Sequence, residues 1–286
     1  MDKTPLVTVG IPVYNGDRYI KQAVMSVLNQ TFRDLELIVT DDGSKDDTLN
    51  ILKDIKDPRL KIVTDGTNHG IAYKLNQQID MARGKYFFRM DADDMMFPYR
   101  LEKQVEVLNS KPEVDVVGGQ AVIIGEEDEI LGKRGVEASD FKGDNDFFLS
   151  ARFIHPTVAG RIEWFKKWRY RDEMSGNEDL DLWIRSHNDS VFFDIEEPLL
   201  FYRDPYRFRL KTYMFRQRRY WKCTWKLREF MSTPLFYSVC MIRGLLSMTF
   251  AIFLALIGQE EQMIAKRNKR LNDNEIGYYN KIIEKI

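Results

Sequence analysis

Short apolar runs alternate with stretches of helical periodicity through the first hundred residues, and this alternation constrains the fold more than any other feature. Such an order is typical of βαβ units and predicts a mainly parallel sheet flanked by helices. The strands are expected at Leu6–Ile11, Leu35–Thr40, Leu60–Val63 and Tyr86–Met90, and the helices at Tyr19–Gln30, Asp46–Ile55, Ile71–Ala82 and after Pro98. The pattern therefore predicts an α/β fold.

A polar cluster follows each of these four strands. The clusters read PVYN (12–15), DDGS (41–44), DGTN (65–68) and DADD (91–94). The carboxyl ends of parallel strands meet at one edge of the sheet, where open α/β sheets bind their ligands. The sequence therefore predicts a ligand site at this edge.

The rest of the chain is less regular. A helix is expected at Leu101–Asn109, a strand at Val114–Gly118 and a second polar concentration at Ser175–Asp181. From Arg203 to Arg228 the chain carries ten Lys or Arg residues and one acid, although its net charge is only -1. We call residues 203–228 the basic segment; the remainder of the chain is acidic by comparison.

Composition excludes several classes of protein. The 286 residues are 44% hydrophobic and 30% charged, which is typical of a folded globular chain and not of a disordered one. The two cysteines have no metal-ligand spacing and favour a reducing compartment. The start of the chain, MDKTPLVTVGIPVYN, lacks the features of a secretory signal, so we expect the body to stay in the cytoplasm.

Asp91 and Asp93 are the first candidates for chemistry. Two carboxylates this close repel each other unless a cation lies between them, and oxygen ligands favour Mg²⁺ or Mn²⁺ over zinc. A solvated acidic turn is the alternative. Gly10 and Gly16 form neither a GxGxxG motif nor a Walker loop, which argues against dehydrogenases and P-loop enzymes.

Six motifs together resemble family 2 glycosyltransferases of the GT-A type, especially the bacterial branch that builds exopolysaccharide, capsule or O-antigen. These motifs are GIPVYNG (10–16), QTFRDLELIVTDDGSKDDT (30–48), NHGIAYKLN (68–76), GKYFFRMDADDMMFPYRLEKQ (84–104), HPT (155–157) and EDLDLWIR (178–185). The resemblance covers about residues 5–203. It implies a GT-A, Rossmann-like sheet and a nucleotide-sugar donor, with UDP preferred.

The resemblance also implies roles for individual residues. Asp91 and Asp93 match the DxD motif that holds Mn²⁺ or Mg²⁺, and Asp179 matches the catalytic base. The positions that match donor-binding residues are Pro12, Tyr14, Asn15, Asp42, Asn68, Asn76 and Asp91. His155, Glu178 and Arg203 are auxiliary or acceptor-side candidates. The His155 position is equally consistent with a structural role, and Arg203 is expected near the diphosphate because no histidine occurs beyond His187 to supply a third metal ligand.

The role of Asp179 has a physical rationale. Inverting transfer needs a base that deprotonates the acceptor hydroxyl, while a metal offsets the charge that grows on the leaving diphosphate. The alternative is that Glu178, Asp179 and Asp181 only favour the start of a helix through its dipole.

The basic segment and the apolar stretch after it predict a membrane-associating helical extension. The basic segment contains seven aromatic residues, and Leu235–Ile257 follows with one charge, Arg243. Arg243 would cost about 2.5–3.5 kcal/mol near the centre of a bilayer. We therefore favour a helix that lies in the inner leaflet. The alternatives are a single span of the membrane, a helix buried in the protein core and an oligomer interface. No nucleic-acid-binding module is recognised.

These observations predict two regions. Residues 1–203 form the glycosyltransferase domain, with a nucleotide-sugar half (1–100) and an acceptor-side half (101–203), and residues 204–286 form the membrane-associated extension.

The predicted function is inverting, metal-dependent sugar transfer to a lipid-linked or polysaccharide acceptor at the cytoplasmic face of an anionic membrane. A noncatalytic nucleotide- or carbohydrate-binding protein is the alternative. A DxD phosphatase fits less well because Met95 stands where it needs Thr or Val. The sugar, the linkage and the oligomeric state are not determined.

Overall fold

The computed structural model describes residues 4–135, 144–149, 151–204, 209–259, 262 and 268–286. Of the basic segment, Pro205, Tyr206, Arg207 and Phe208 lie outside this part. The strands are β1 (Val7–Val13), β2 (Leu35–Asp41), β3 (Leu60–Thr64), β4 (Tyr86–Arg89), β5 (Met95–Met96), β6 (Val116–Ile124), β7 (Ile130–Arg134), β8 (Ala159–Arg161) and β9 (Phe192–Arg203). The helices are α1 (Ile20–Leu28), α2 (Thr48–Asp54), α3 (Ile71–Met81), α4 (Arg100–Ser110), α5 (Asp146–Leu149), α6 (Ile162–Lys167), α7 (Glu178–Ser186), α8 (Leu210–Lys226), α9 (Pro234–Leu256) and α11 (Asp273–Ile283).

The N-terminal half of the sheet is parallel, as predicted. β1 lies between β2 and β4, and Val9 pairs with Leu37 on one side and with Phe88 on the other. β3 continues the sheet beside β2. Nearly every residue of β1 and all of β2 are buried, because helices cover both faces of this part of the sheet.

The second half makes the whole sheet mixed. The strand order is β3-β2-β1-β4-β8-β6-β9-β5, and β7 pairs with β6. β8 is antiparallel to both β4 and β6, whereas the long strand β9 is parallel to β6. The strand expected at Val114–Gly118 is therefore the start of a longer one, β6, which continues to Ile124.

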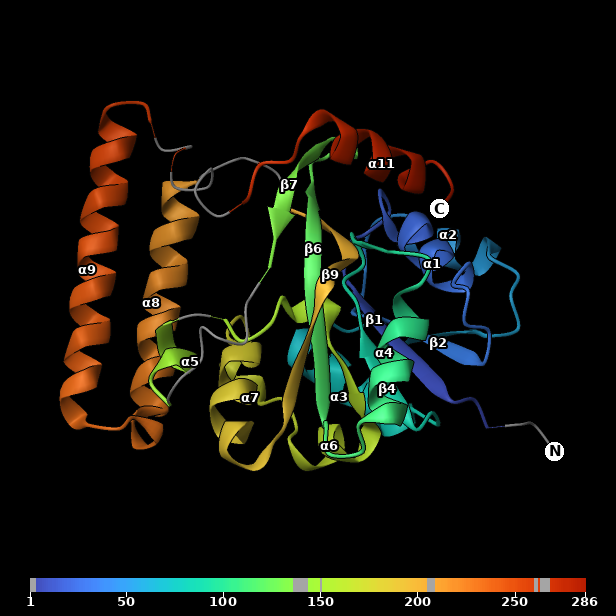
Figure 1. The fold of residues 1–286 in the computed structure, drawn as a ribbon, viewed down its shortest axis with the longest axis horizontal. Helices are drawn as coiled ribbons and strands as arrows, with labels where there is room; N and C mark the ends of the chain where they lie inside the picture. Colours follow the sequence, from blue (N-terminus) through green and yellow to red (C-terminus); the bar gives the residue numbers. More distant parts are fainter. Residues whose placement is uncertain (1–3, 136–143, 150, 205–208, 260–261, 263–267) are drawn as a thin grey trace.

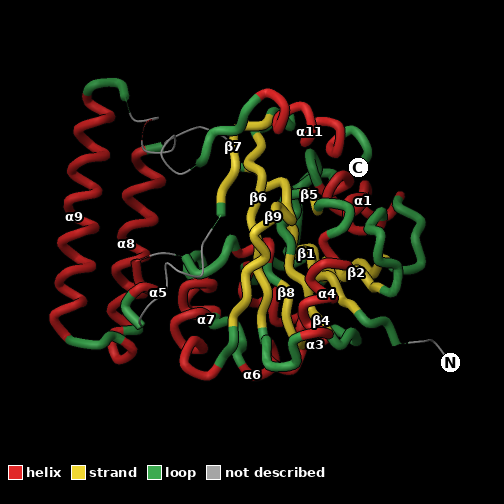
Figure 2. The backbone as a smooth tube through the Cα atoms, in the orientation of Figure 1, coloured by secondary structure: helices red, strands yellow, loops and turns green. Residues whose placement is uncertain are grey.

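Two helical layers enclose the sheet (Figures 1 and 2). The core on one face contains residues of α1 and α4, and the core on the other face contains residues of α3, α6 and α7. Gly84 permits a close approach at the base of the sheet, because a Cβ there would lie 2.5 Å from the backbone nitrogen of Thr8. Because β1 pairs in parallel with both β2 and β4, the carboxyl ends of these three strands lie at one edge of the sheet.

The C-terminal region contains two separate units. α8 and α9 pack together as a hairpin at one side of the molecule, with α8 between α9 and the body (Figure 1). α11 instead returns to the sheet, where Tyr279 packs against Phe97 and Phe201. The division expected at residue 203 assigns α11 to the extension, whereas the contacts of α11 are with residues of the sheet.

Candidate active site

The loop after β1 lies at the predicted edge of the sheet. Tyr14 has an exposed ring, with half of its surface accessible, whereas Pro12 is partly buried. Asn15 has a left-handed backbone (φ 52°), and its side-chain oxygen accepts a hydrogen bond from the backbone nitrogen of Lys45. Its own backbone nitrogen donates to Ser44 Oγ at 2.9 Å. Asn15 therefore joins the first polar cluster to the second.

The carboxylate of Asp42 holds the third polar cluster. It accepts hydrogen bonds from the backbone nitrogens of His69 (2.7 Å) and Gly70 (2.9 Å). The buried ammonium of Lys74 lies 3.8 Å from Asp42 Oδ1 and 3.5 Å from Asp65 Oδ1. Asn68 is exposed in this loop. The structure thus joins Asp42 to the backbone next to Asn68, through His69 and Gly70, and adds the cation of Lys74, which the sequence analysis missed.

The side chain of Asn76 bonds to the protein backbone at Tyr170. Its amide nitrogen donates to the carbonyl oxygen of Tyr170 at 2.8 Å, and its amide oxygen accepts from the backbone nitrogen of Tyr170 at 3.1 Å. Both polar atoms of the side chain are therefore used to fix the segment before α7. Its expected place beside the nucleotide stays a prediction.

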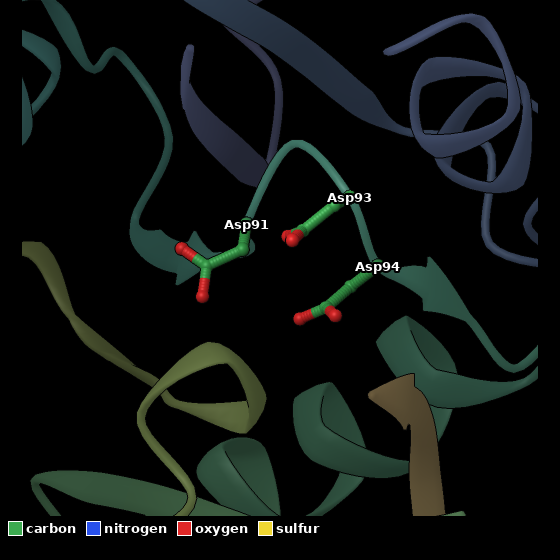
Figure 3. Close-up of side chains that lie close together, drawn as sticks. All are labelled: Asp91, Asp93 and Asp94. Atoms are coloured by element: carbon green, nitrogen blue, oxygen red, sulfur yellow. The ribbon is translucent and has the colours of Figure 1, made fainter. Parts of the chain in front are cut away.

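Three aspartates form an acidic turn directly after β4. One carboxylate oxygen of each of Asp91, Asp93 and Asp94 lies within 4.8 Å of the others. Figure 3 shows the side chains of Asp93 and Asp94 pointing toward the side on which Asp91 lies, whereas the carboxylate of Asp91 extends away from them. The sequence analysis selected Asp91 and Asp93 but missed Asp94, which is fully buried. Its Oδ2 has no hydrogen-bond partner among the residues that the structure describes.

The electrostatics of the acidic turn suit a divalent cation. Desolvation and repulsion by Asp91 raise the pKa of Asp93 to about 6. Burial and the charges of both neighbours raise the pKa of Asp94 well above its ordinary value. An all-oxygen set with an unsatisfied buried atom fits Mg²⁺ or Mn²⁺, because a hard cation would compensate the charges that now repel each other.

Arg89 is a buried cation at the centre of the site. It pairs with Asp91 through both terminal nitrogens, with NH2 2.6 Å from Oδ1 and NH1 3.0 Å from Oδ2. Its positive charge also interacts with Tyr170 and with Glu178 at the start of α7. The sequence signal that could have revealed it is a charged residue inside the apolar strand YFFR.

The guanidinium of Arg203 joins the acidic turn to the loop after β6. Its Nε donates to the carbonyl oxygen of Asp93 at 2.9 Å, and its NH1 donates to the carbonyl oxygen of Gly125 at 2.6 Å. NH2 pairs with Asp128, and the guanidinium lies 4.0 Å from the centre of the Tyr19 ring. The guanidinium nitrogens of Arg203 thus donate their hydrogen bonds to protein groups. The expected contact of Arg203 with the diphosphate of the nucleotide sugar stays a prediction.

Glu178 and Asp179 begin α7, the helix start that the sequence analysis gives as the alternative to a catalytic role. Burial raises the pKa of Glu178, and the neighbouring charge of Asp179 adds to that rise. Burial also raises the pKa of Asp179; Asp91 contributes in the same direction, whereas Arg89 opposes it. The charges of Asp91 and Arg89 therefore both act on the start of α7.

His155 is a buried residue next to Tyr170. Its Nε2 lies 2.9 Å from the hydroxyl of Tyr170, and its ring packs edge-to-face with Trp183. Burial and the charge of Arg89 hold its pKa well below the ordinary value, so the ring is neutral at pH 7. These contacts give His155 a structural place, and an acceptor-side role stays a prediction.

Comparisons with known proteins agree with this geometry. The family model described as glycosyl transferase family 2 matches residues 8–169. An uncharacterized glycosyltransferase of Methanocaldococcus jannaschii is 32% identical over 247 residues, which cover 83% of this chain and 85% of that relative.

Solved structures share the fold at low sequence identity. TarS of S. aureus in complex with UDP has a TM-score of 0.57 and 21% identity; the match covers 76% of this chain and 64% of that one. The mannosyltransferase PcManGT from Pyrobaculum calidifontis, in complex with GDP-Man and Mn²⁺, has a TM-score of 0.61 and 18% identity, covering 85% and 70%. The mixed sheet is thus of the GT-A type, and because the family model spans more than half of the chain, this protein belongs to glycosyl transferase family 2.

Proposed function

We propose that this protein is an inverting, metal-dependent glycosyltransferase that moves a sugar from a nucleotide-sugar donor, preferably UDP-linked, to a lipid-linked or polysaccharide acceptor. The observation that carries the proposal is the arrangement around Arg89. Arg89 pairs with Asp91 of the acidic turn, and its charge also acts on Glu178 at the start of α7. This supports a single site that would hold both the donor-side and the acceptor-side groups.

The edge loops support nucleotide-sugar binding. Tyr14 offers an exposed ring for a base, and Asp42 holds the loop that carries Asn68. TarS binds UDP and UDP-GlcNAc, and PcManGT binds GDP-Man. A uracil base stacked on Tyr14 is consistent with this arrangement.

Asp91, Asp93 and Asp94 are the residues that would hold Mn²⁺ or Mg²⁺. The cation supplies charge neutralisation for the diphosphate as it leaves. The protein's own part is to fix the carboxylates in place: Arg89 orients Asp91, and the backbone nitrogen of Arg203 donates to Asp94 at 2.9 Å. Two oriented carboxylates in a rigid turn bind a cation better than flexible ones.

Asp179 is the proposed base. A carboxylate accepts a proton from a sugar hydroxyl more readily when its pKa is raised, and burial raises the pKa of Asp179. The backbone nitrogen of Leu180 donates to its Oδ1 at 2.8 Å, which leaves Oδ2 for the acceptor. The charge of Arg89 acts against the rise in the pKa of Asp179 and so favours the ionised form that a base requires.

The proposed place of action is the cytoplasmic face of the membrane. Among the described helices, α9 is the one long and apolar enough to cross a bilayer, with a mean hydropathy of 2.1. Only 28% of its most apolar window is buried, and Leu246, Phe253 and Leu256 are more than half exposed. Burying such a surface in lipid, beside the cations of α8, favours peripheral attachment.

Calorimetry tests the donor site. UDP, GDP, dTDP and CDP are titrated into the protein with Mn²⁺ and again after chelation, and we expect metal-dependent binding with UDP preferred. Release of UDP from a UDP-sugar is then measured with and without membranes that contain lipid-linked glycans. Binding without any acceptor-stimulated release would indicate a noncatalytic nucleotide-binding protein. The absence of binding for all four nucleotides would contradict the proposed donor site.

A further inference from the structure

A groove of about 530 Å³ runs along α8, outside the site described above. It is lined by Phe215, Arg218, Arg219, Trp221, Lys222, Trp225 and Tyr237. All except Tyr237 lie on α8, and Tyr237 lies in the first turn of α9. The groove therefore opens where the basic helix meets the apolar one.

The lining combines positive charge with aromatic surface. Arg218, Arg219 and Lys222 are one helical turn apart or less, so their charges converge on the groove. In the part of the chain that the structure describes, no acidic side chain forms an ion pair with any of them. Phe215 and Trp225 are more than half exposed. This composition suits an anion attached to an apolar chain better than a small soluble anion.

One wall of the groove touches the loop before α7. The guanidinium of Arg219 lies against Gly176: a Cβ added to Gly176 would be 2.5–2.6 Å from its Cζ and terminal nitrogens. Gly176 in turn donates its backbone N–H to the carboxylate of Glu178. The groove thus adjoins the loop that leads into Glu178 and Asp179.

Resting on the glycosyl transfer proposed above, we propose that this groove binds the phosphate or diphosphate group of the lipid-linked acceptor. Arg218, Arg219 and Lys222 neutralise the headgroup, the aromatic rings contact the first part of the lipid chain, and the exposed apolar surface of α9 continues into the bilayer. The contact of Arg219 with Gly176 then places the headgroup, and the glycan attached to it, beside the start of α7.

The test compares vesicles that differ in headgroup but not in surface charge. The purified full chain is titrated with phosphatidylcholine vesicles that contain either a phosphomonoester lipid, phosphatidic acid, or enough phosphatidylglycerol to match its surface potential. Diffuse attraction depends on surface charge alone, so it gives equal binding to both. We expect about tenfold tighter binding to the phosphomonoester vesicles, as charge-assisted hydrogen bonds to one headgroup would give.

The groove variant is Arg218→Gln/Arg219→Gln/Lys222→Gln, and the control is Lys211→Gln/Arg216→Gln/Lys226→Gln. The control removes the same charge from exposed positions of α8 that do not line the groove. We expect the headgroup preference to disappear in the groove variant and to persist in the control. If the groove variant lacks a thermal unfolding transition, the single variant Lys222→Gln, at an exposed position, takes its place.

The proposal would be overturned if the unaltered chain bound both kinds of vesicle equally, or if both variants lost the headgroup preference to the same extent. It would also be overturned if inorganic pyrophosphate bound as tightly as the lipid, because that would indicate a site for a free anion. Binding of UDP with Mn²⁺ is measured on the same samples. Loss of nucleotide binding in every sample would refute the proposed donor site, whereas a missing headgroup preference with intact nucleotide binding would refute the groove alone.

Discussion

Replacing Arg89 by Met tests whether the buried cation holds the acidic turn together. Arg89 is 2% exposed, and both of its terminal nitrogens contact the carboxylate of Asp91, which is itself only 26% exposed at the side chain. Met fills a similar volume but carries no charge. The change therefore leaves Asp91 without its counter-ion, next to the carboxylates of Asp93 and Asp94.

Removing one partner of a buried ion pair costs about 3–5 kcal/mol, because the remaining charge is uncompensated. We expect the free energy of unfolding to fall by this amount in Arg89→Met, which corresponds to a decrease in Tm of about 10 °C for a domain of this size. Urea unfolding in the presence of a chelator measures the loss as a lower midpoint at an unchanged m value.

Two further variants make the measurement specific. Lys166→Met breaks the exposed pair with Glu163 and should change the free energy of unfolding by less than about 0.5 kcal/mol. The double variant Arg89→Met/Asp91→Asn removes the unpaired charge as well, so it should be more stable than Arg89→Met alone. A loss below about 1 kcal/mol in Arg89→Met, or additive losses in the double variant, would refute the reasoning.

Three other predictions follow from the site and the fold. Asp179→Asn should retain UDP binding by calorimetry and lose sugar transfer by about 10²–10⁴-fold; unchanged transfer would remove Asp179 from the role of base. The affinity for Mn²⁺ should fall as the pH drops through about 6, where Asp93 becomes protonated, by up to about tenfold per pH unit; a flat titration between pH 5 and 7 would contradict this. Gly84→Ala should cost about 1–3 kcal/mol in urea unfolding because its Cβ meets the backbone of Thr8, whereas Gly277→Ala, in open space on α11, should be neutral or stabilising; equal effects would exclude the clash.

In the first hundred residues the hydrophobic pattern alone predicts the secondary structure. The four strands, the helices between them and the polar cluster after each strand are all where the alternation predicts them, within one to two residues. These features depend on neighbours in the sequence, since side-chain periodicity and turn residues report the local backbone. β9 was missed because Asp194, Glu196 and Glu197 interrupt its apolar pattern.

Those residues of the candidate site that belong to local sequence motifs could likewise be predicted. The motif positions Asp91, Asp93 and Asp179 could be identified from sequence, and the structure places Asp91 and Asp93 in one acidic turn. Asp94 and Arg89 could not be assigned, because their importance depends on being buried next to other charges. Burial of a polar group is decided by what packs over it, and that information is not local.

The sequence by itself thus determined the α/β class, the edge of the sheet that carries the polar loops, and the family resemblance. Only the tertiary structure decided the partners of the polar groups: Arg203 turned to the backbone of Asp93, and Asn76 bonded to Tyr170. It also placed α11 on the sheet and Arg219 beside Gly176. The physical reason is that these contacts join residues 43 to 182 positions apart, which no local periodicity can report. Packing and charge compensation in the folded chain select them.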